Sequence, residues 1–335
     1  MLNIGVIGVG YWGPNIIRNF TALPDSNVVL CADVRKERLD FITSLYPKIE
    51  VTTCEEDVIK DKRIDAVAIV TPVSTHFKLA KESIENGKHL LLEKPMCGTI
   101  DECKELVDLA YKKNKIIMVD HTFIYHPAIK KCKELIEIGE LGDKLFYFDS
   151  VRINLGLFQH DINVIWDLAP HDLSIMDYLI NEKPVAVSAC GAAHFRLPVE
   201  DVAYITVKFE SQLIAHFQVS WLAPVKIRRT VISGSSKMLV YDDMDPSEKI
   251  KIYDKGITVN ESIYETLISY RTGDMWAPKI STKEALRDEC EHFLDCVMHN
   301  KKPITDAENG LRIVRLLGAA DESIKSNGCW VSCKE

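Results

Sequence analysis

The sequence predicts an α/β protein with two domains: a doubly wound parallel sheet in residues 1–122 and an α+β domain with a mostly antiparallel sheet in residues 123–335. A chain of 335 residues is too long for one small core, so about two domains are expected. Strand and helix signals alternate in the first part, which is typical of βαβ units. In the second part several strands follow one another on short turns, which favours antiparallel pairing. The terminal helices remain free to pack back on the first domain.

Bulk composition excludes several classes of protein. Hydrophobic residues make up 47% and charged residues 27% of the chain, which argues against extensive disorder. A net charge of −8 without a basic block argues against binding to nucleic acid. No apolar run approaches the roughly 18 residues that cross a bilayer, and glycines interrupt the first strand, so we expect no signal peptide and a cytoplasmic protein. Ten scattered cysteines without a C-x-x-C pair predict free thiols.

The first domain is read from short runs of β-branched residues or leucine, typical of parallel strands that are buried on both faces. Predicted strands span 2–7, 27–33, 49–52, 65–71, 88–92 and 115–119, and predicted helices span 12–22, 35–45, 75–86 and 99–113.

The first strand runs into the glycine-rich turn Gly8-x-Gly10-x-x-Gly13, which opens a helix. The first glycine permits a tight turn, the second lets the backbone approach a pyrophosphate, and the third lets the helix pack closely on the strand. The amino end of the following helix directs its amide groups and positive dipole end at the same pyrophosphate. This spacing predicts a dinucleotide site.

Asp33 ends the second strand, 20 residues after Gly13. An acid at this place accepts hydrogen bonds from the adenosine ribose and repels a 2′-phosphate, which favours NAD over NADP. The adjacent Arg35 and Lys36 leave room for NADP. Capping of the next helix is the structural alternative for Asp33, and this role is compatible with the ribose contact.

Two further strands are expected to deliver polar residues to the carboxyl edge of the sheet, where ligands bind in such folds. Thr71-Pro72 ends one of them, and the following His76 either lines the cofactor site or packs at the start of a helix. Glu93-Lys94-Pro95 ends the other. Lys94, oriented by Glu93, is suited to hold a substrate hydroxyl or to lose its proton when desolvated, although an exposed charged loop is the alternative.

The second domain is expected to begin with a helix from Pro127 to Gly139 and to end with helices over 283–299 and 306–323. Residues 254–282 contain glycine and proline and are predicted to form a long irregular functional loop. Predicted strands lie between these segments at 144–153, 185–193, 201–209, 212–221, 226–233 and 237–241.

Asp167 and His171 lie in a stretch that reads as a loop entering a helix, with Pro170 in its first turn. Their spacing of four places them on one helix face, where a carboxylate beside an imidazole forms a reasonable acid–base unit. A capping aspartate and a helix-face histidine are the structural alternative. Further ligands at workable spacing are missing, so no metal site is expected.

Taken together, these motifs resemble the Gfo/Idh/MocA oxidoreductase family along nearly the whole chain. The resemblance implies an N-terminal Rossmann domain and a C-terminal α/β domain with an open, mostly antiparallel sheet. The outer face of that sheet commonly makes subunit contacts in the family, so a homodimer or homotetramer is expected. The resemblance also implies that Lys94, Asp167 and His171 form the catalytic group.

One departure from the family pattern points to a subgroup. Where many members carry a glycine-rich run before the aspartate, this chain has Asn163-Val164-Ile165-Trp166. The stretches 166–172 and 270–274 look like those of members that act on nucleotide-linked sugars, such as the UDP-N-acetyl-sugar 3-dehydrogenases of cell-surface polysaccharide biosynthesis. The expected reaction is NAD-dependent oxidation at C3 of a UDP-N-acetyl-hexosamine or its uronate. The alternatives are an NAD(P)H-dependent keto-sugar reductase, a polyol or inositol dehydrogenase, and a non-catalytic NAD-binding sensor.

The residues assigned to the site fall into two groups. Cofactor contacts are predicted for Gly8, Gly10, Tyr11, Trp12, Gly13, Asp33, Arg35, Thr71, Pro72, His76, Glu93, Lys94 and His121. Substrate contacts are predicted for Lys94, Arg152, Asn154, Asn163, His171 and Arg271, with Arg228 and Arg229 as further candidates to hold a diphosphate.

Overall fold

The computed structural model describes residues 1–156, 162–195, 199–261 and 266–333. The chain forms two compact units, one of residues 1–125 with 283–315 and one of residues 126–282 with 316–335. The last helix, α9 (Ala307–Lys325), begins in the first unit and ends in the second. Among the described residues, every helix is too short or too polar to cross a membrane.

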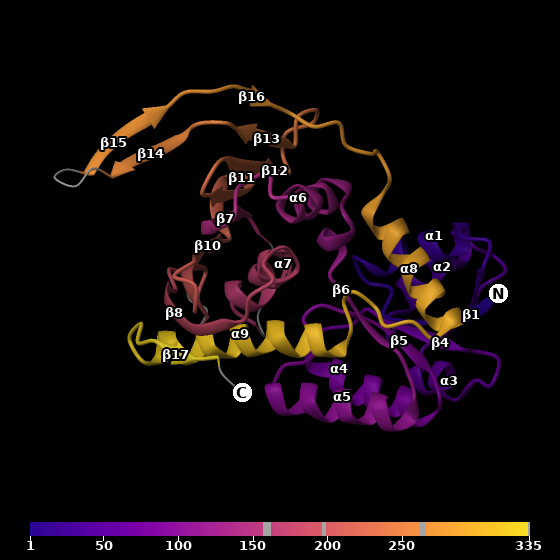
Figure 1. The fold of residues 1–335 in the computed structure, drawn as a ribbon. Helices are drawn as coiled ribbons and strands as arrows, with labels where there is room; N and C mark the ends of the chain where they lie inside the picture. Colours follow the sequence, from indigo (N-terminus) through magenta and orange to yellow (C-terminus); the bar gives the residue numbers. More distant parts are fainter. Residues whose placement is uncertain (157–161, 196–198, 262–265, 334–335) are drawn as a thin grey trace. The chain divides into compact units, whose positions relative to one another are not determined.

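The first unit is built on a six-stranded parallel sheet in the order β3-β2-β1-β4-β5-β6. Figure 1 labels β1, β4, β5 and β6 of this sheet. This order confirms the predicted doubly wound parallel sheet. Its elements are β1 (Leu2–Ile7), α1 (Gly13–Ala22), β2 (Ser26–Ala32), α2 (Lys36–Leu45), β3 (Glu50–Thr52), α3 (Glu55–Lys60), β4 (Ala66–Ile69), α4 (Val73–Glu85), β5 (His89–Glu93), α5 (Ile100–Lys113), β6 (Ile117–Asp120), the short 3-10 helix η1 (Thr122–Tyr125) and α8 (Ala285–His299).

Burial of apolar strands on both faces holds this sheet together. All four residues of β4 and all four of β6 are buried, so the sequences of these strands do not alternate between apolar and polar residues. Helix α8, far away in the chain, packs on α1 through an edge-to-face contact of Phe20 and Phe293, whose ring centroids lie 6.1 Å apart. Because the strands are parallel, their carboxyl ends share one edge, which gathers the predicted cofactor residues of this unit.

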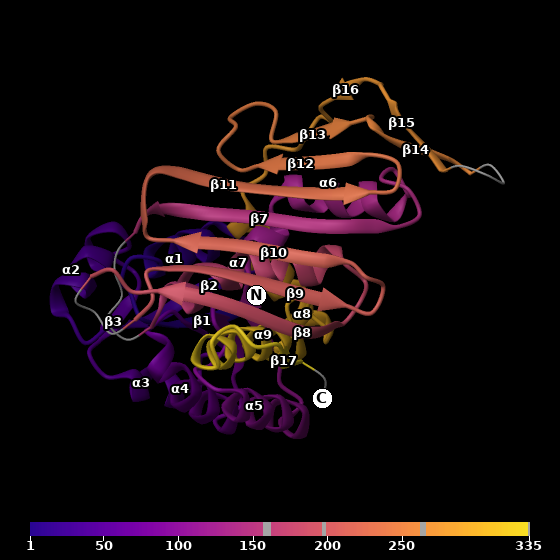
Figure 2. The same ribbon diagram turned by 90° about the vertical axis from the view of Figure 1, so that its left-hand side faces the viewer.

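The second unit carries a nine-stranded sheet in the order β16-β13-β12-β11-β7-β10-β9-β8-β17, shown side by side in Figure 2. Neighbouring strands are antiparallel except for the parallel pair β7 and β10, as predicted for a mostly antiparallel sheet. The strands are β7 (Leu145–Leu155), β8 (Pro184–Ala192), β9 (Val202–Phe209), β10 (Ile214–Ser220), β11 (Leu222–Gly234), β12 (Met238–Asp242), β13 (Ile250–Tyr253), β16 (Met275–Trp276) and β17 (Val331–Ser332).

Helix α7 (Val164–Leu179) packs on β7, β9 and β10, and α6 (Pro127–Glu137) packs on α7 and β12. Strand β9 shows the resulting alternation, since Ala203, Ile205 and Val207 are buried whereas Tyr204 is exposed. One face of the sheet therefore forms a core with the helices. The other face presents large apolar side chains, among them Tyr204 and Ile214.

The prediction of an irregular loop at 254–282 is wrong. A hairpin of β14 (Gly256–Glu261) and β15 (Thr266–Arg271) occupies this segment, followed by β16. Gly273, one of the glycines that suggested a loop, serves close backbone approach instead, because a Cβ there would overlap the carbonyl oxygen of Asp254.

The expected start of the helix carrying His171 is also wrong. Helix α7 begins at Val164, where the Asn163 side chain caps it by accepting hydrogen bonds from the amides of Ile165 and Trp166, each 3.1 Å long. Pro170 therefore lies inside the helix rather than in its first turn. The apolar residues before Asp167 extend the buried face of the helix by almost one turn, which the proline signal obscured.

Candidate active site

The glycine-rich turn has the geometry that a pyrophosphate cradle requires. Gly8 adopts φ +95°, a conformation that favours glycine, and its amide donates to the carbonyl of Ala32 at 2.8 Å. A Cβ at Gly13 would overlap the carbonyl oxygen of Gly8, so only glycine allows α1 to start this close to β1. The described residues thus fit a dinucleotide at the amino end of α1.

Asp33 follows β2 and is bonded directly to the glycine-rich turn. Its Oδ2 accepts from the Val9 amide at 2.9 Å, and its Oδ1 accepts from the Arg35 amide at 2.9 Å. Burial alone would raise the pKa of this carboxyl, but the hydrogen bonds from Arg35 and Val9 outweigh burial and lower the pKa. An ionised carboxylate has about four acceptor sites, so Asp33 retains capacity for a ribose hydroxyl.

Arg38 was not singled out from the sequence, although it reaches the same turn. Its Nε donates to the carbonyl of Val9 at 2.8 Å, and its Nη2 donates to the carbonyl of Gly10. These bonds fix the turn from the side of α2. In the sequence, Arg38 is marked only by its position in the first turn of the predicted helix 35–45.

We expect Asp33→Ala to raise the KM for NAD about 10- to 100-fold, because a charge-assisted hydrogen bond to the ribose is lost. The KM for NADP should change much less, so the ratio of the KM for NADP to the KM for NAD should fall toward one. Steady-state kinetics with both cofactors measures the ratio, and Asp40→Ala, an exposed aspartate on α2, is the matched control. An equal change for both cofactors would contradict the ribose contact.

The ends of β4 and β5 bring the next predicted residues to the same edge. Thr71 follows β4 and Lys94 follows β5, and both are half-buried. His76 is fully buried, with Nε2 2.8 Å from the carbonyl oxygen of Thr71 and Nδ1 3.0 Å from that of Pro95. The ring therefore links the turns after the two strands, and burial lowers its pKa. This packing favours a positioning role over direct contact with the cofactor.

The remaining cofactor candidates differ in exposure. Tyr11 is 87% exposed, whereas His121 is 1% exposed. Trp12 is half-buried, and its indole Nε1 donates to Oδ2 of Asp120 at 2.9 Å. Asp120 ends β6 and was not predicted as a site residue.

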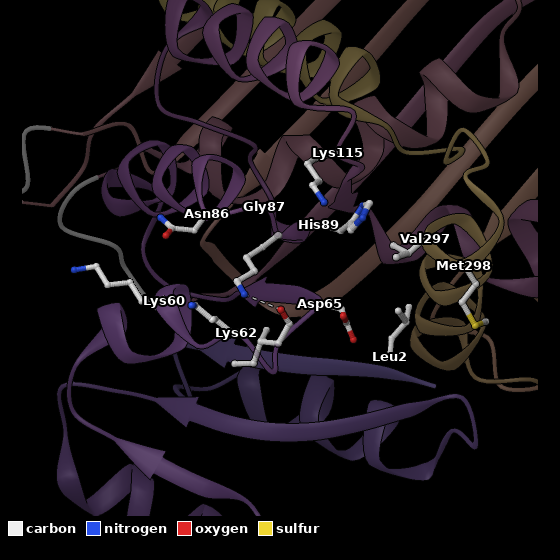
Figure 3. A pocket seen from close by; sticks show the side chains of 12 residues that line it. Leu2, Lys60, Lys62, Asp65, Asn86, Gly87, His89, Lys115, Val297 and Met298 are labelled. Carbon is white, nitrogen blue, oxygen red and sulfur yellow. Dashed lines mark hydrogen bonds between the residues drawn. The ribbon is translucent and has the colours of Figure 1, made fainter.

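A pocket of about 650 Å³ lies at the opposite edge of the parallel sheet (Figure 3). Leu2, Asp65 and His89 line it from the starts of their strands, together with several lysines. One of these, Lys88, donates to the carbonyls of Asp61 and Ile64 at 2.6 and 2.7 Å. The pocket is therefore distinct from the predicted cofactor edge.

In the second unit, Asp167 and His171 both lie on α7 and both are half-buried. Oδ2 of Asp167 accepts from the indole Nε1 of Trp221 at 2.9 Å, and Trp221 itself is fully buried. Trp221 therefore fixes the carboxylate that was predicted to orient His171. The sequence analysis missed this tryptophan because it lies 54 residues away in the chain.

Two predicted substrate contacts are engaged inside the second unit. Arg152 is 2% exposed, and its Nε and Nη2 donate to the two oxygens of Asp172 at 2.6 and 3.0 Å. Asn163 caps α7 and donates to Glu200 and Asp321 at 3.0 Å each. Both arrangements favour structural roles for these side chains.

The other polar candidates lie at or near strands. Asn154 is half-buried on β7. Arg228 is paired with Asp243 at 3.3 Å, whereas Arg229 is exposed. Arg271 forms an ion pair with Asp254 and donates to the Ser236 carbonyl at 2.7 Å. Among the described residues, there is no group of three or more histidine, cysteine or acidic side chains that could hold a metal ion.

Comparison with known proteins supports the family that the sequence motifs resemble. The family model of the GFO/IDH/MocA oxidoreductases with an NAD-binding Rossmann fold matches residues 2–121, and the C-terminal domain model of the same family matches residues 129–240. The chain is 26% identical over 322 residues to the UDP-N-acetylglucosamine 3-dehydrogenase of Acidithiobacillus ferrooxidans, covering 93% of this chain and 94% of that protein.

A second relative is the scyllo-inositol 2-dehydrogenase (NAD(+)) of Bacillus subtilis, 26% identical over 89% of this chain and 87% of that protein. The solved structure of the Acidithiobacillus ferrooxidans enzyme matches with a TM-score of 0.82 at 24% identity, over 97% of this chain and 98% of that one. This likeness supports the fold. Together with the two family models, which span more than half of the sequence, it identifies the chain as an NAD-binding oxidoreductase of the Gfo/Idh/MocA family.

Proposed function

We propose that the protein oxidises a secondary hydroxyl group of a sugar with NAD, and that its substrate is a UDP-linked N-acetylhexosamine or the corresponding uronate, oxidised at C3. The observation that carries the proposal is the pair of Asp167 and His171 on one face of α7, in a chain whose first unit ends β5 in Glu93-Lys94. The activity printed for the Acidithiobacillus ferrooxidans relative supports the substrate class.

In the proposed reaction His171 removes the proton of the sugar hydroxyl. Asp167, itself held by the indole of Trp221, orients the imidazole. Lys94 donates a hydrogen bond to the same oxygen and stabilises its developing charge. The exchange of these two roles, with Lys94 as the base, is the alternative assignment. Bound NAD would accept the hydride from the carbon.

The second candidate function is oxidation of a free polyol, favoured by the relative that acts on scyllo-inositol. A panel of UDP-sugars, free sugars and inositols, each tested with NAD and NADP, separates the candidates through the absorbance of the reduced nicotinamide. Turnover of UDP-N-acetylhexosamines at least about tenfold above that of inositols supports the proposal, since binding of the nucleotide adds affinity. Preference for inositols, or keto-sugar reduction without measurable oxidation, would overturn it, as would NAD binding without any turnover.

We further propose that copies of the chain associate through the face of the second sheet that presents Tyr204 and Ile214. An exposed apolar surface of this kind is typical of an interface. The native mass of the protein should accordingly be that of a homodimer or homotetramer.

A further inference from the structure

Three carboxyl groups meet inside the first unit, and we call them the carboxyl trio: Glu93, Asp120 and Glu289. Parallel pairing of β5 and β6 sets Glu93 directly opposite Asp120. Glu289 on α8 interacts with the side chain of Asp120 and lies near Glu93. Glu289 is completely buried, while Asp120 is 3% exposed. Three ionised carboxylates in such a space would repel one another strongly, because burial weakens solvent screening.

The hydrogen-bond donors are distributed very unevenly over the trio. Asp120 accepts from the indole of Trp12 at 2.9 Å on Oδ2 and from the hydroxyl of Thr122 on Oδ1. By contrast, within the described part of the chain neither carboxyl oxygen of Glu289 has a hydrogen-bond partner, and the same holds for Oε2 of Glu93.

A neighbouring carboxylate cannot supply the missing donor. Two carboxyl groups form a hydrogen bond only when one of them carries a proton, which then acts as the donor. Burial raises the pKa of Glu93 and of Glu289 well above the ordinary value, and the nearby charge of Asp120 raises both further. The indole of Trp12 and the hydroxyl of Thr122 both donate to Asp120, so the donors are concentrated on this member of the trio.

We propose that Glu93 and Glu289 are each protonated and each donate a hydrogen bond to an ionised Asp120. Asp120 then acts as a positioning residue for the NAD site. Its carboxylate holds Trp12, the residue that precedes α1 and lies inside the glycine-rich turn. Neutral Glu93 and Glu289 also remove two negative charges from the sheet edge that receives an anionic cofactor. This inference depends on NAD binding and is independent of the proposed sugar substrate.

Other charged or titratable groups also face the trio. Lys94 favours the ionised form of Glu93, but its influence is smaller than those of burial and Asp120. Tyr125 on η1 and Cys290 on α8 are close to Glu289, and the pKa of each is raised mainly by burial. Burial and Asp120 raise the pKa of Glu289 by more than the hydroxyl of Thr122 on η1 lowers it.

Binding of NADH to the wild type, to three single variants and to one double variant tests the positioning role without any sugar. Asp120→Asn should raise the Kd for NADH roughly tenfold or more, because the charged acceptor of Trp12 is lost. The matched control Glu289→Gln should leave the Kd nearly unchanged, since an amide N–H replaces the acid O–H as donor. Trp12→Phe should weaken binding, and the double variant with Asp120→Asn should bind no more weakly than Asp120→Asn alone.

Additive losses in Trp12→Phe and Asp120→Asn would contradict the positioning role, because a merely structural contribution of Asp120 would not depend on Trp12. If Asp120→Asn fails to fold, Trp12→Phe decides alone: an unchanged Kd for NADH overturns the role. Equal weakening by Glu289→Gln would also overturn the assignment of the ionised member.

The pH dependence of stability tests the protonation of Glu289. A raised pKa in the folded state means that the folded protein binds more protons than the unfolded chain above a pH of about 4.3, so stability falls as the pH rises. Glu289→Gln removes this loss. From pH 5 to pH 9 the unfolding equilibrium constant of the wild type should therefore rise by up to about tenfold per pH unit relative to the variant. A constant ratio over this range would overturn the proposal.

Discussion

Replacing His171 with alanine is expected to lower kcat by about 10²- to 10⁴-fold, the usual contribution of a positioned general base. NADH binding should remain as in the wild type, because the glycine-rich turn and Asp33 belong to the first unit and His171 to the second. Stopped-flow or steady-state kinetics measures the loss, and fluorescence titration with NADH measures the retained binding. Full turnover by this variant on the true substrate would remove His171 from the mechanism.

Variants of Lys94 distinguish whether Lys94 or His171 is the general base and which of them stabilises the charge on the substrate oxygen. Lys94→Arg keeps a positive charge and hydrogen-bond donors but cannot release a proton at working pH. If Lys94 only stabilises the oxygen, the arginine variant should retain more activity than Lys94→Ala. Imidazole in the assay should partly restore His171→Ala if His171 is the base. Equal inactivity of both Lys94 variants, together with failure of imidazole, would instead support the exchanged roles.

Breaking the ion pair between Arg152 and Asp172 is expected to lower the free energy of unfolding by about 3–5 kcal/mol, because the remaining charge stays buried without its partner. Arg152→Met and Asp172→Leu should each show this loss in urea denaturation followed by tryptophan fluorescence. The double variant should recover most of it, because an apolar pair of similar volume avoids the cost of burying charge.

The exposed pair of Lys131 and Glu134 on α6 offers a matched control in the same unit. Removing it should cost less than about 1 kcal/mol, as is usual for solvated ion pairs. If Arg152 contacts the sugar instead, Arg152→Met would raise the KM for substrate and leave stability almost unchanged. That outcome would restore the sequence-based assignment of Arg152 to the substrate.

The glycine-rich turn shows which features of the candidate site follow from the sequence. The turn, Asp33 and the polar residues after β4 and β5 depend on local conformation and on strand ends, which spacing in the sequence encodes directly. The comparisons confirm the family and its NAD-binding first domain. The predicted loop at 254–282 and the predicted start of α7 were wrong, because a glycine can serve close packing within a hairpin and a proline can lie inside a helix.

Asp120 and Arg152 show what could not be predicted. Asp120 reads as the end of an apolar strand, and its importance follows from Trp12 and Glu289, which lie 108 and 169 residues away in the chain. The sequence makes Arg152 a candidate ligand for sugar, yet its guanidinium donates two hydrogen bonds to Asp172 within the second unit.

The sequence by itself determined the fold class and the family, and it predicted the edge of the parallel sheet for NAD, because each depends on periodicity and short-range spacing. Only the tertiary structure decided which polar side chains are satisfied internally and which carboxyl groups lack a donor. A hydrogen bond or a buried charge pair depends on distances between segments that are remote in the chain, and such distances exist only after folding.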